Sequence, residues 1–366
     1  MSEKTPIPVS VLTGFLGAGK TTLLNKLLKD PLMSDTAVII NEFGDVGIDH
    51  LLVETADDNI FEMASGCLCC TIRGDLVDTL SNLVERRDNG DIKAFNRVVI
   101  ETTGLADPAP VLHTIMNHPY LLQRYRLEGV ITVIDAVNGE ATLDAHEEAV
   151  KQVAVADRLV LAKADLLSGK QGEDKLFAII ARLKKLNPAA RMLEVTSGEA
   201  VPQNLFNTGI YDPATKTANV ARWLAADAYE QAGKHHHHHE HDKNRHDDRI
   251  QSFSISSDKA ISRWNLDLFM ELLRSYHGPN LLRVKGIIKL EEDPQKPMVI
   301  HGVQHIFHPP FQMAQWPDDD HRSRLVFITR DIKRAQLADL FKAFTDPVRG
   351  GADAFRDDTL SLRKGD

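Results

Sequence analysis

A glycine-rich segment close to the start of the chain has the residue types and spacing of a phosphate-binding loop. Residues 14–21 read GFLGAGKT and fit G-x-x-x-x-G-K-[ST], between a predicted strand and a predicted helix. Glycines let backbone N–H groups turn toward phosphate oxygens, and a helix N-terminus adds partial positive charge. We expect Lys20 to reach the β- and γ-phosphates of a nucleotide and the Thr21 hydroxyl to bind Mg²⁺. The expected phosphate-side residues are Gly14, Gly17, Ala18, Gly19, Lys20, Thr21 and Thr22.

Two acidic side chains follow later predicted strands and complete this chemistry. Residues 41–49 read NEFGDVGID, and Asp49 is placed to join the Mg²⁺ shell directly or through water. Glu101 ends the next apolar strand and is expected to hold Mg²⁺ or position the attacking water, while the N–H of Gly104 touches the γ-phosphate. An ordinary acidic loop and a helix-capping carboxylate are the alternatives for these two positions. The residues expected to take part in catalysis are Lys20, Glu101 and Asp49.

A K-x-D sequence after another predicted strand is typical of guanine recognition. The carboxylate of Asp165 can accept hydrogen bonds from the ring N–H and the exocyclic amine of guanine, and the stem of Lys163 can cover the base. Adenine has an acceptor where guanine has the ring N–H, so the pattern favours GTP. The residue before the lysine is Ala162, where Asn or Thr is usual, and this removes one side-chain hydrogen bond from the base pocket.

All the cysteines of the chain lie within four positions. Cys67, Cys69 and Cys70 form the sequence GCLCC, and three thiols in a reducing compartment favour a soft metal such as Zn²⁺. The spacing differs from the C-x₂-C of structural zinc modules, so we expect an incomplete site that suits a metal that must leave. A redox pair or a buried apolar cluster is the alternative.

Seven of the sixteen histidines lie in one polar stretch between residues 235 and 246. The stretch contains no apolar residue between 234 and 249, so we expect a solvated linker rather than part of a core. Its histidines are interpreted as a weak, unselective metal reservoir, with a merely solvated loop or an expression tag as alternatives. The expected reservoir residues are His235, His236, His237, His238, His239 and His241.

The composition bounds the class of protein. The 366 residues carry a formal net charge of −9, which disfavours a general nucleic-acid binder. No apolar run approaches the length of a membrane span, and the first residues lack a signal-peptide core. Three cysteines do not make a disulfide framework, so we expect a cytoplasmic protein with no membrane partner.

Short apolar runs alternate with helical patterns up to about residue 225, which predicts an α/β fold with a mostly parallel sheet covered by helices on both faces. The expected strands are 7–12, 37–40, 97–100, 129–135, 158–162 and 191–196, and the expected helices are 20–28, 75–87, 145–156 and 174–186. A smaller α+β domain is predicted after residue 250, with strands 250–256, 281–290, 298–307 and 325–329 and helices 266–276 and 333–344. The chain is thus divided into a nucleotide-binding domain (1–225), a His-rich linker (226–249) and a C-terminal domain (250–366).

The motifs GFLGAGKTT, NEFGDVGID, GCLCC, ETTGLADP and AKAD, in this order, resemble those of the CobW-like metallochaperone GTPases. That family is related to the urease and hydrogenase nickel-insertion GTPases. The resemblance implies a P-loop NTPase-type domain, a ferredoxin-like C-terminal domain, and hydrolysis of GTP to GDP and phosphate coupled to delivery of zinc or cobalt to a client metalloprotein. By position it implies that Cys67, Cys69 and Cys70 form the metal site, with Glu42 as an added ligand.

The position of the cysteines gives a physical reason to couple metal and nucleotide. They lie between Asp49 and Glu101, so a nucleotide that orders these flanking segments would change the geometry of the metal ligands. Metal must then change GTP affinity by the same factor. Two alternatives remain: a metal-binding sink whose nucleotide site does not drive release, and a P-loop kinase acting on a small molecule. The kinase is disfavoured because we find no Arg-rich lid segment and it gives the cysteines no role.

Overall fold

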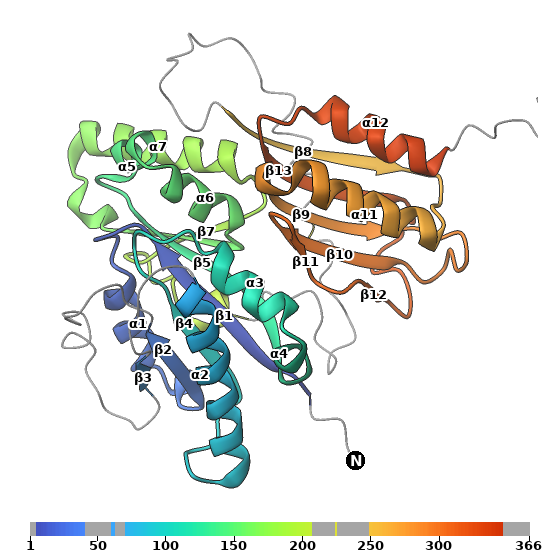
Figure 1. The fold of residues 1–366 in the computed structure, drawn as a ribbon. Helices are drawn as coiled ribbons and strands as arrows, with labels where there is room; N and C mark the ends of the chain where they lie inside the picture. Colours follow the sequence, from blue (N-terminus) through green and yellow to red (C-terminus); the bar gives the residue numbers. More distant parts are fainter. Residues whose placement is uncertain (1–4, 41–59, 63–69, 207–223, 225–248, 347–366) are drawn as a thin grey trace, which may run out of the picture.

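The structure is a computed structural model, which describes residues 5–40, 60–62, 70–206, 224 and 249–346. Within these ranges the chain forms two sheets, one made from the N-terminal half and one from the C-terminal part (Figure 1). None of the helices in these ranges is long and apolar enough to cross a membrane. The expected division of the chain at residues 225 and 249 stays a prediction.

The first sheet has seven parallel strands in the order β3-β2-β4-β1-β5-β6-β7. The strands β2 and β6 are buried along their whole length and consist mostly of apolar residues, because both faces of the sheet are covered. The strands are β1 (Ile7–Gly14), β2 (Thr36–Ile40), β3 (Ile60–Glu62), β4 (Arg97–Glu101), β5 (Tyr125–Asp135), β6 (Arg158–Ala162) and β7 (Arg191–Glu194).

Helices cover both faces of this sheet, which confirms the predicted α/β architecture. Neighbouring residues of β1 point to opposite cores: Val11 packs with the helices α2 and α3, and Leu12 packs with α1. The helices α6 and α7 share the face of α2 and α3, packing on the β6 residues Leu159 and Leu161. The helices of this domain are α1 (Lys20–Leu28), α2 (Cys70–Asn89), α3 (Ala109–Asn117), α4 (Pro119–Arg124), α5 (Gly139–Ala145), α6 (Glu147–Val155), α7 (Gly169–Leu186) and α8 (Pro202–Leu205).

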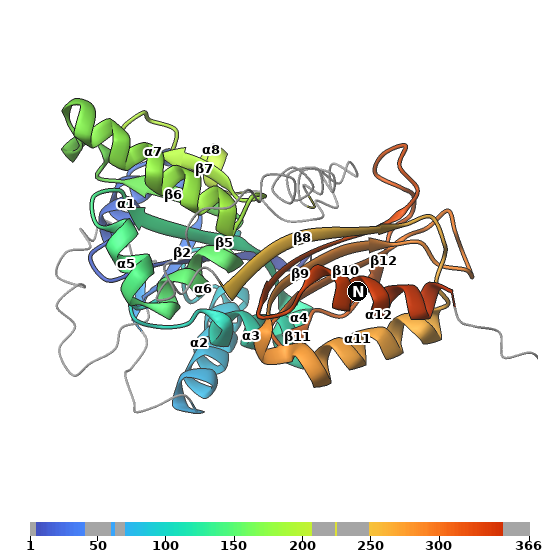
Figure 2. The same cartoon turned by 90° about the horizontal axis from the view of Figure 1, so that it is seen from above.

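The C-terminal domain is an antiparallel sheet in the order β11-β10-β9-β13-β8, with β12 paired to β10. Two helices, α11 (Arg263–His277) and α12 (Arg334–Thr345), lie side by side on one face of it (Figure 2). The other face packs on the first domain, where Ala154 of α6 joins a shared apolar core with sheet residues such as Leu282 and Val299. The strands are β8 (Ile250–Ser257), β9 (Leu281–Ile288), β10 (Met298–Val303), β11 (Ile306–Phe307), β12 (Phe311–Gln312) and β13 (Ser323–Arg330).

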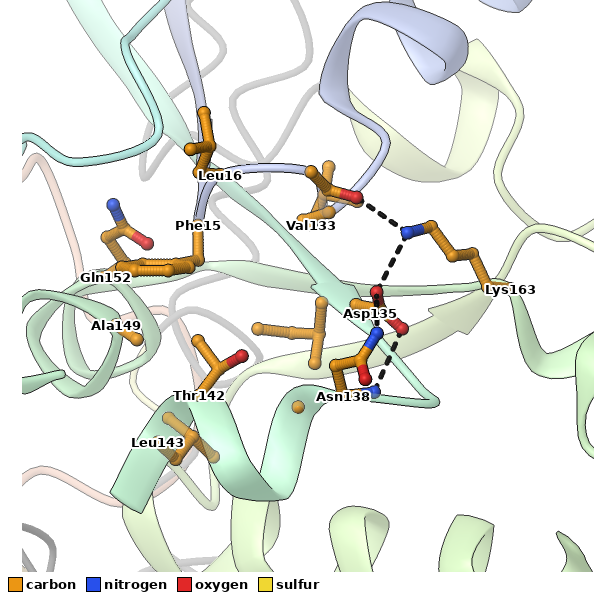
Figure 3. Close-up of a pocket in the computed structure, with 14 residues that line it drawn as sticks. Phe15, Leu16, Val133, Asp135, Asn138, Thr142, Leu143, Ala149, Gln152 and Lys163 are labelled. Atoms are coloured by element: carbon orange, nitrogen blue, oxygen red, sulfur yellow. Dashed lines mark hydrogen bonds and ion pairs between the residues drawn. The ribbon is translucent and has the colours of Figure 1, made fainter. Parts of the chain in front are cut away.

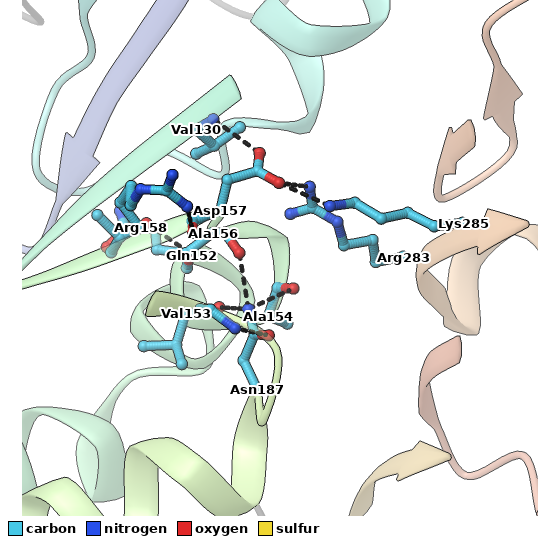
Figure 4. Close-up of polar contacts among 12 residues, drawn as sticks. Val130, Gln152, Val153, Ala154, Ala156, Asp157, Arg158, Asn187, Arg283 and Lys285 are labelled. Atoms are coloured by element: carbon cyan, nitrogen blue, oxygen red, sulfur yellow. Dashed lines mark hydrogen bonds and ion pairs between the residues drawn. The ribbon is translucent and has the colours of Figure 1, made fainter. Parts of the chain in front are cut away.

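A buried group of charges joins the two domains (Figure 4). Asp157, between α6 and β6, accepts hydrogen bonds from Arg283 at 2.5 Å and Lys285 at 2.7 Å, both on β9, and from the N–H of Val130 at 3.0 Å. Burial alone would raise the pKa of Asp157, but the two cations hold it far below its usual range. Burial and repulsion from Arg283 outweigh the attraction of the single carboxylate and lower the pKa of Lys285 to about 7.

Several predicted elements differ from the observed ones. The expected strand 298–307 is two strands, β10 and β11, because the chain turns at Gln304, whose φ is +54°. The expected helix 145–156 is the shorter α6, preceded by α5. The structure adds β3, α3, α4 and α8, which were not predicted, and α2 begins at Cys70 rather than residue 75.

Candidate nucleotide site

The predicted phosphate loop connects β1 and α1 and contains glycines with positive φ values. Gly17 and Gly19 have φ values of +72° and +101°, which favour glycine because a Cβ clashes with the backbone in this region. Gly14 has a φ of +141° and packs so closely on the backbone of Val133 in β5 that a side chain at this position would overlap it. The sequence therefore folds into a loop whose backbone can approach a ligand closely.

Lys20 and Thr21 occupy the first turn of α1 and face the loop and the neighbouring strand. The ammonium of Lys20 is buried and donates to the carbonyl oxygen of Gly14 at 3.0 Å. The hydroxyl of Thr21 donates to Glu101 Oε1 at 3.0 Å, and Glu101 is itself buried at the end of β4. The structure thus brings together the predicted residues Lys20, Thr21 and Glu101. The side chain of Thr22, the next residue of α1, is exposed.

The pair Thr21–Glu101 has the donor chemistry of a magnesium site. A hydroxyl and a carboxylate next to a phosphate-binding loop supply the hard oxygen ligands that Mg²⁺ prefers, and the cation usually keeps several waters besides. The alternative interpretation of Glu101 as a helix cap does not fit, because its carboxylate bonds the Thr21 side chain and α3 starts eight residues later, at Ala109.

The loop after β4 lies against the phosphate loop. A Cβ at Gly104 would come within 2.5 Å of Leu16 Cα, so only glycine lets the two backbones approach this closely. Thr102 fixes the start of the loop, since its N–H donates to the carbonyl of Leu12 and its hydroxyl donates to Thr13 Oγ1, both at 2.9 Å. The predicted position of Gly104 beside the phosphate site agrees with this packing.

On the other side of the phosphate loop, Lys163 links two loops. Its ammonium donates to the carbonyl of Gly17 at 2.7 Å and to Asp135 Oδ2 at 2.8 Å (Figure 3). Its φ is +62°, so the residue turns the chain sharply between β6 and the short helix Ala164–Leu166. Asp165 lies exposed in that short helix, with its carboxylate accessible to a ligand.

Asp135, at the end of β5, is a site residue that the sequence reasoning missed. It accepts hydrogen bonds from Lys163 and from the N–H groups of Val137 at 2.8 Å and Asn138 at 3.1 Å. Burial alone would raise its pKa, but these bonds hold the pKa below its ordinary value. The available signal was its position as an acidic residue at the carboxyl end of a predicted strand, where ligands bind in α/β sheets.

Ala162 lies at the phosphate loop as well as before the K-x-D sequence. Its side chain is buried, and a Cβ built on Gly19 would lie 3.7 Å from the Cβ of Ala162. Its carbonyl accepts a hydrogen bond from the N–H of Ala136 at 2.9 Å. The small side chain thus lets the end of β6 lie close to the loop.

A cavity of about 230 Å³ lies between the phosphate loop and the helices α5 and α6 (Figure 3). Phe15 forms one wall, and its ring stacks on His146 with a centroid distance of 4.3 Å. Asp135 and Lys163 border the opposite side, and Gln152 lines it from α6. The cavity adjoins the phosphate loop on the side of these two helices.

Several predicted site residues lie outside the described part of the chain. These are Glu42, Asp49, Cys67, Cys69 and the histidines 235–239 and 241. Cys70 is the first residue of α2, and its side chain is not described. Within the described ranges no group of three or more His, Cys, Asp and Glu side chains is arranged to hold a metal ion.

Residues 8–194 match the CobW/HypB/UreG nucleotide-binding domain, and residues 250–345 match the cobalamin synthesis protein CobW C-terminal domain. The chain belongs to the CobW/HypB/UreG family. This confirms the resemblance of its motifs and the P-loop fold of its first domain.

Two curated members of the family are similar over nearly the whole chain. The zinc chaperone YjiA of Escherichia coli (strain K12) is 34% identical over 337 residues, which is 92% of this chain and 98% of that protein. The zinc chaperone CobW of Pseudomonas aeruginosa is 31% identical over 370 residues, covering 92% of this chain and 91% of the relative. A crystal structure of zinc-bound YjiA GTPase from E. coli superposes with a TM-score of 0.66 at 29% identity, over 93% of this chain and 99% of that one.

Proposed function

We propose that this protein is a metallochaperone that hydrolyses GTP to GDP and phosphate and passes a transition metal to a client metalloprotein. The phosphate loop with its Thr21–Glu101 pair carries the proposal, supported by 34% identity to a zinc chaperone along 92% of the chain. Zinc is the metal we favour, with cobalt second. The client is unidentified, and we retain the expectation of a cytoplasmic protein without nucleic-acid or membrane partners.

In this proposal the nucleotide phosphates lie on the loop 14–19 and are held by its N–H groups and Lys20. Mg²⁺ would be held by the Thr21 hydroxyl with Glu101, and by Asp49, and it would neutralise charge on the phosphates. Glu101 also positions the attacking water, and Gly104 contacts the γ-phosphate. Asp165 and Lys163 recognise guanine.

The transferred metal is bound by Cys67, Cys69 and Cys70, with Glu42 as an added ligand. Strand order supports a link between this site and the nucleotide. β2 ends at Ile40, directly opposite Glu101 in the parallel register, so the segment carrying Glu42 leaves the sheet beside the Mg²⁺ ligand. α2 begins at Cys70, the third thiol. The described elements that flank the three cysteines in the sequence are β3, which ends at Glu62, and α2.

The test compares zinc affinity in two nucleotide states. Tight-site zinc affinity is measured with a non-hydrolysable GTP analogue and with GDP, and a coupling of about 1.4 kcal/mol gives a tenfold difference. Replacing all three cysteines by Ser removes the tight site, because a hydroxyl stays protonated, and abolishes the effect of zinc on GTP turnover. Lys20→Ala cripples GTP hydrolysis and leaves zinc bound.

A metal sink is the competing function, and the same measurement separates the two. Identical zinc affinities with the GTP analogue and with GDP mean that hydrolysis cannot drive release, and the sink interpretation is then correct. Deleting residues 235–246 tests the reservoir: the number of weakly bound metal ions falls, while tight binding and GTP turnover stay. Loss of tight binding in the deletion contradicts the reservoir assignment.

A further inference from the structure

A polar side chain lies buried on the apolar face of α6. Gln152 is 1% exposed and lies between Ala149 and Val153, which pack into the core of the first domain. A buried amide is costly unless its hydrogen bonds are made, so its partners tell what the residue does. Its position is fixed from the other side too, since its backbone carbonyl accepts a hydrogen bond from Thr132 Oγ1 of β5 at 2.8 Å.

The Gln152 amide reaches the loop between β4 and α3. Its Nε2 donates to the carbonyl of Ala106 at 3.1 Å and to the carbonyl of Gly104 at 3.4 Å. Both acceptors are carbonyl oxygens, so the NH₂ group must face them, and the orientation of the amide follows. One side chain therefore fixes two peptide groups of the loop at the same time.

These peptide groups belong to the part of the loop that borders the phosphate site. The loop is pressed between two elements: Gly104 lies against the backbone of Leu16 in the phosphate loop, and Gln152 holds it from α6. A trans peptide places each N–H opposite the carbonyl of the preceding residue, so holding the carbonyls of residues 104 and 106 also fixes the direction of the N–H groups of Leu105 and Asp107.

We propose that Gln152 is a positioning residue for GTP hydrolysis, which holds the loop from Gly104 to Asp107 in one conformation beside the phosphate loop, where it meets the γ-phosphate. The proposal rests on the GTPase activity proposed above. Phosphoryl transfer depends almost entirely on positioning and electrostatic stabilisation, and a displacement of about 1 Å can cost ~100-fold in rate. GDP has no γ-phosphate, so its binding does not depend on this loop.

The adjoining residue secures the far end of the same loop. Lys151 pairs with Asp107 Oδ2 at 3.5 Å, and Gln304 of the C-terminal domain donates to the same oxygen at 3.1 Å. Asp107 Oδ1 accepts a hydrogen bond from the N–H of Ala109, the first residue of α3. The end of the loop is thus held from α6 and from the second domain, while Gln152 controls the part beside the phosphates.

The experiment replaces Gln152 by Met, which keeps the side-chain length and removes the donors. We expect kcat for GTP hydrolysis to fall ~10- to 100-fold, with GDP affinity within about twofold of the wild type. The matched control is Asn187→Leu. Asn187 is 2% exposed and donates to the carbonyls of Val153 and Ala156 at 2.8 Å, so it secures the C-terminal end of the same helix without touching the loop.

If Gln152 has a merely structural role, Gln152→Met and Asn187→Leu both lose stability but keep the wild-type kcat at temperatures where they are folded. That outcome overturns the proposal. Gln152→Asn is the second variant: it retains the amide, folds with less disturbance and is one methylene too short to reach both carbonyls, so its kcat must fall as well. Wild-type protein without GTP turnover contradicts the proposed function and this role together. Wild-type turnover with unchanged kcat in both Gln152 variants contradicts only the positioning role.

Discussion

Two carboxylates of the first domain each bind a lysine at nearly the same distance, yet they serve different purposes. Asp135 holds Lys163 at 2.8 Å beside the phosphate loop, and the Lys163 side chain is 35% exposed. Asp157 holds Lys285 at 2.7 Å between the domains, where the Lys285 side chain is only 7% exposed and Arg283 shares the same carboxylate oxygen.

The difference lies in solvent access and in charge balance. The partly exposed pair has one cation per carboxylate and borders a cavity, so its lysine can exchange partners at little cost. The buried group places Arg283 and Lys285 on one carboxylate, so loss of Asp157 leaves the Arg283 charge without its partner in the interior. The first arrangement suits recognition, and the second fixes one domain on the other.

The largest expected effect comes from breaking the buried group. Asp157→Asn leaves Arg283 and Lys285 buried opposite a neutral amide, so the free energy of unfolding should fall by about 3–5 kcal/mol. Urea denaturation measures it. The control is Asp331→Asn, which breaks the exposed ion pair with Arg249 and should cost much less stability. Equal losses in the two variants would show that burial does not distinguish these pairs.

A smaller effect concerns the pH dependence of the same group. The folded-state pKa of Lys285 is about 7 and its ordinary value is 10.5, so between these values the unfolded chain binds a proton that the folded chain does not. This term makes the free energy of unfolding rise with pH from about 7 upward, by at most ~1.4 kcal/mol per unit. Lys285→Met leaves the Asp157–Arg283 pair intact and removes this contribution to the pH dependence of the free energy of unfolding.

Urea denaturation at pH 7, 8 and 9 checks this. The buried His301 leaves the sign unchanged, because burial keeps its pKa well below the ordinary value and it is neutral throughout this range. A wild type and a Lys285→Met variant with the same slope would contradict the lowered pKa.

The smallest effect on stability is expected at the exposed pair. Lys163→Met keeps the apolar stem and removes the ammonium, so unfolding should change by about 1 kcal/mol or less. GTP affinity should fall roughly tenfold, because the bond to the Gly17 carbonyl holds the phosphate loop next to the loop that follows β6. Titration calorimetry gives the affinity, with the exposed Lys170→Met as control. If Lys163→Met loses much stability and keeps its GTP affinity, the Asp135–Lys163 pair is structural and the contrast with the Asp157 group is wrong.

The sequence predicted the parts of the site that short motifs encode. The phosphate loop and the partners Thr21 and Glu101 follow from local patterns, because the glycine conformations and the strand–turn–helix context depend on adjacent residues. The alternation of apolar runs with helical patterns likewise predicted the parallel sheet and the smaller second domain.

The residues that the sequence did not reveal act over long separations. Asp135 meets Lys163 across 28 positions, and Gln152 meets Gly104 across 48, so no local pattern marks either contact. A glutamine on an apolar helix face is visible in the sequence, but its acceptors depend on how α6 packs. The turn at Gln304 was missed because a non-glycine residue with positive φ carries no composition signal.

The strand order also constrains how the chain can be assembled on a ribosome. β1 is synthesised first, yet its neighbours β4 and β5 are complete only when Asp135 has emerged. In the second domain the last strand, β13, inserts between β9 and β8, so that sheet closes only after Arg330. Both sheets therefore expose unpaired apolar strands for most of their synthesis, when such edges are prone to aggregate. Rapid translation of each domain shortens that exposure.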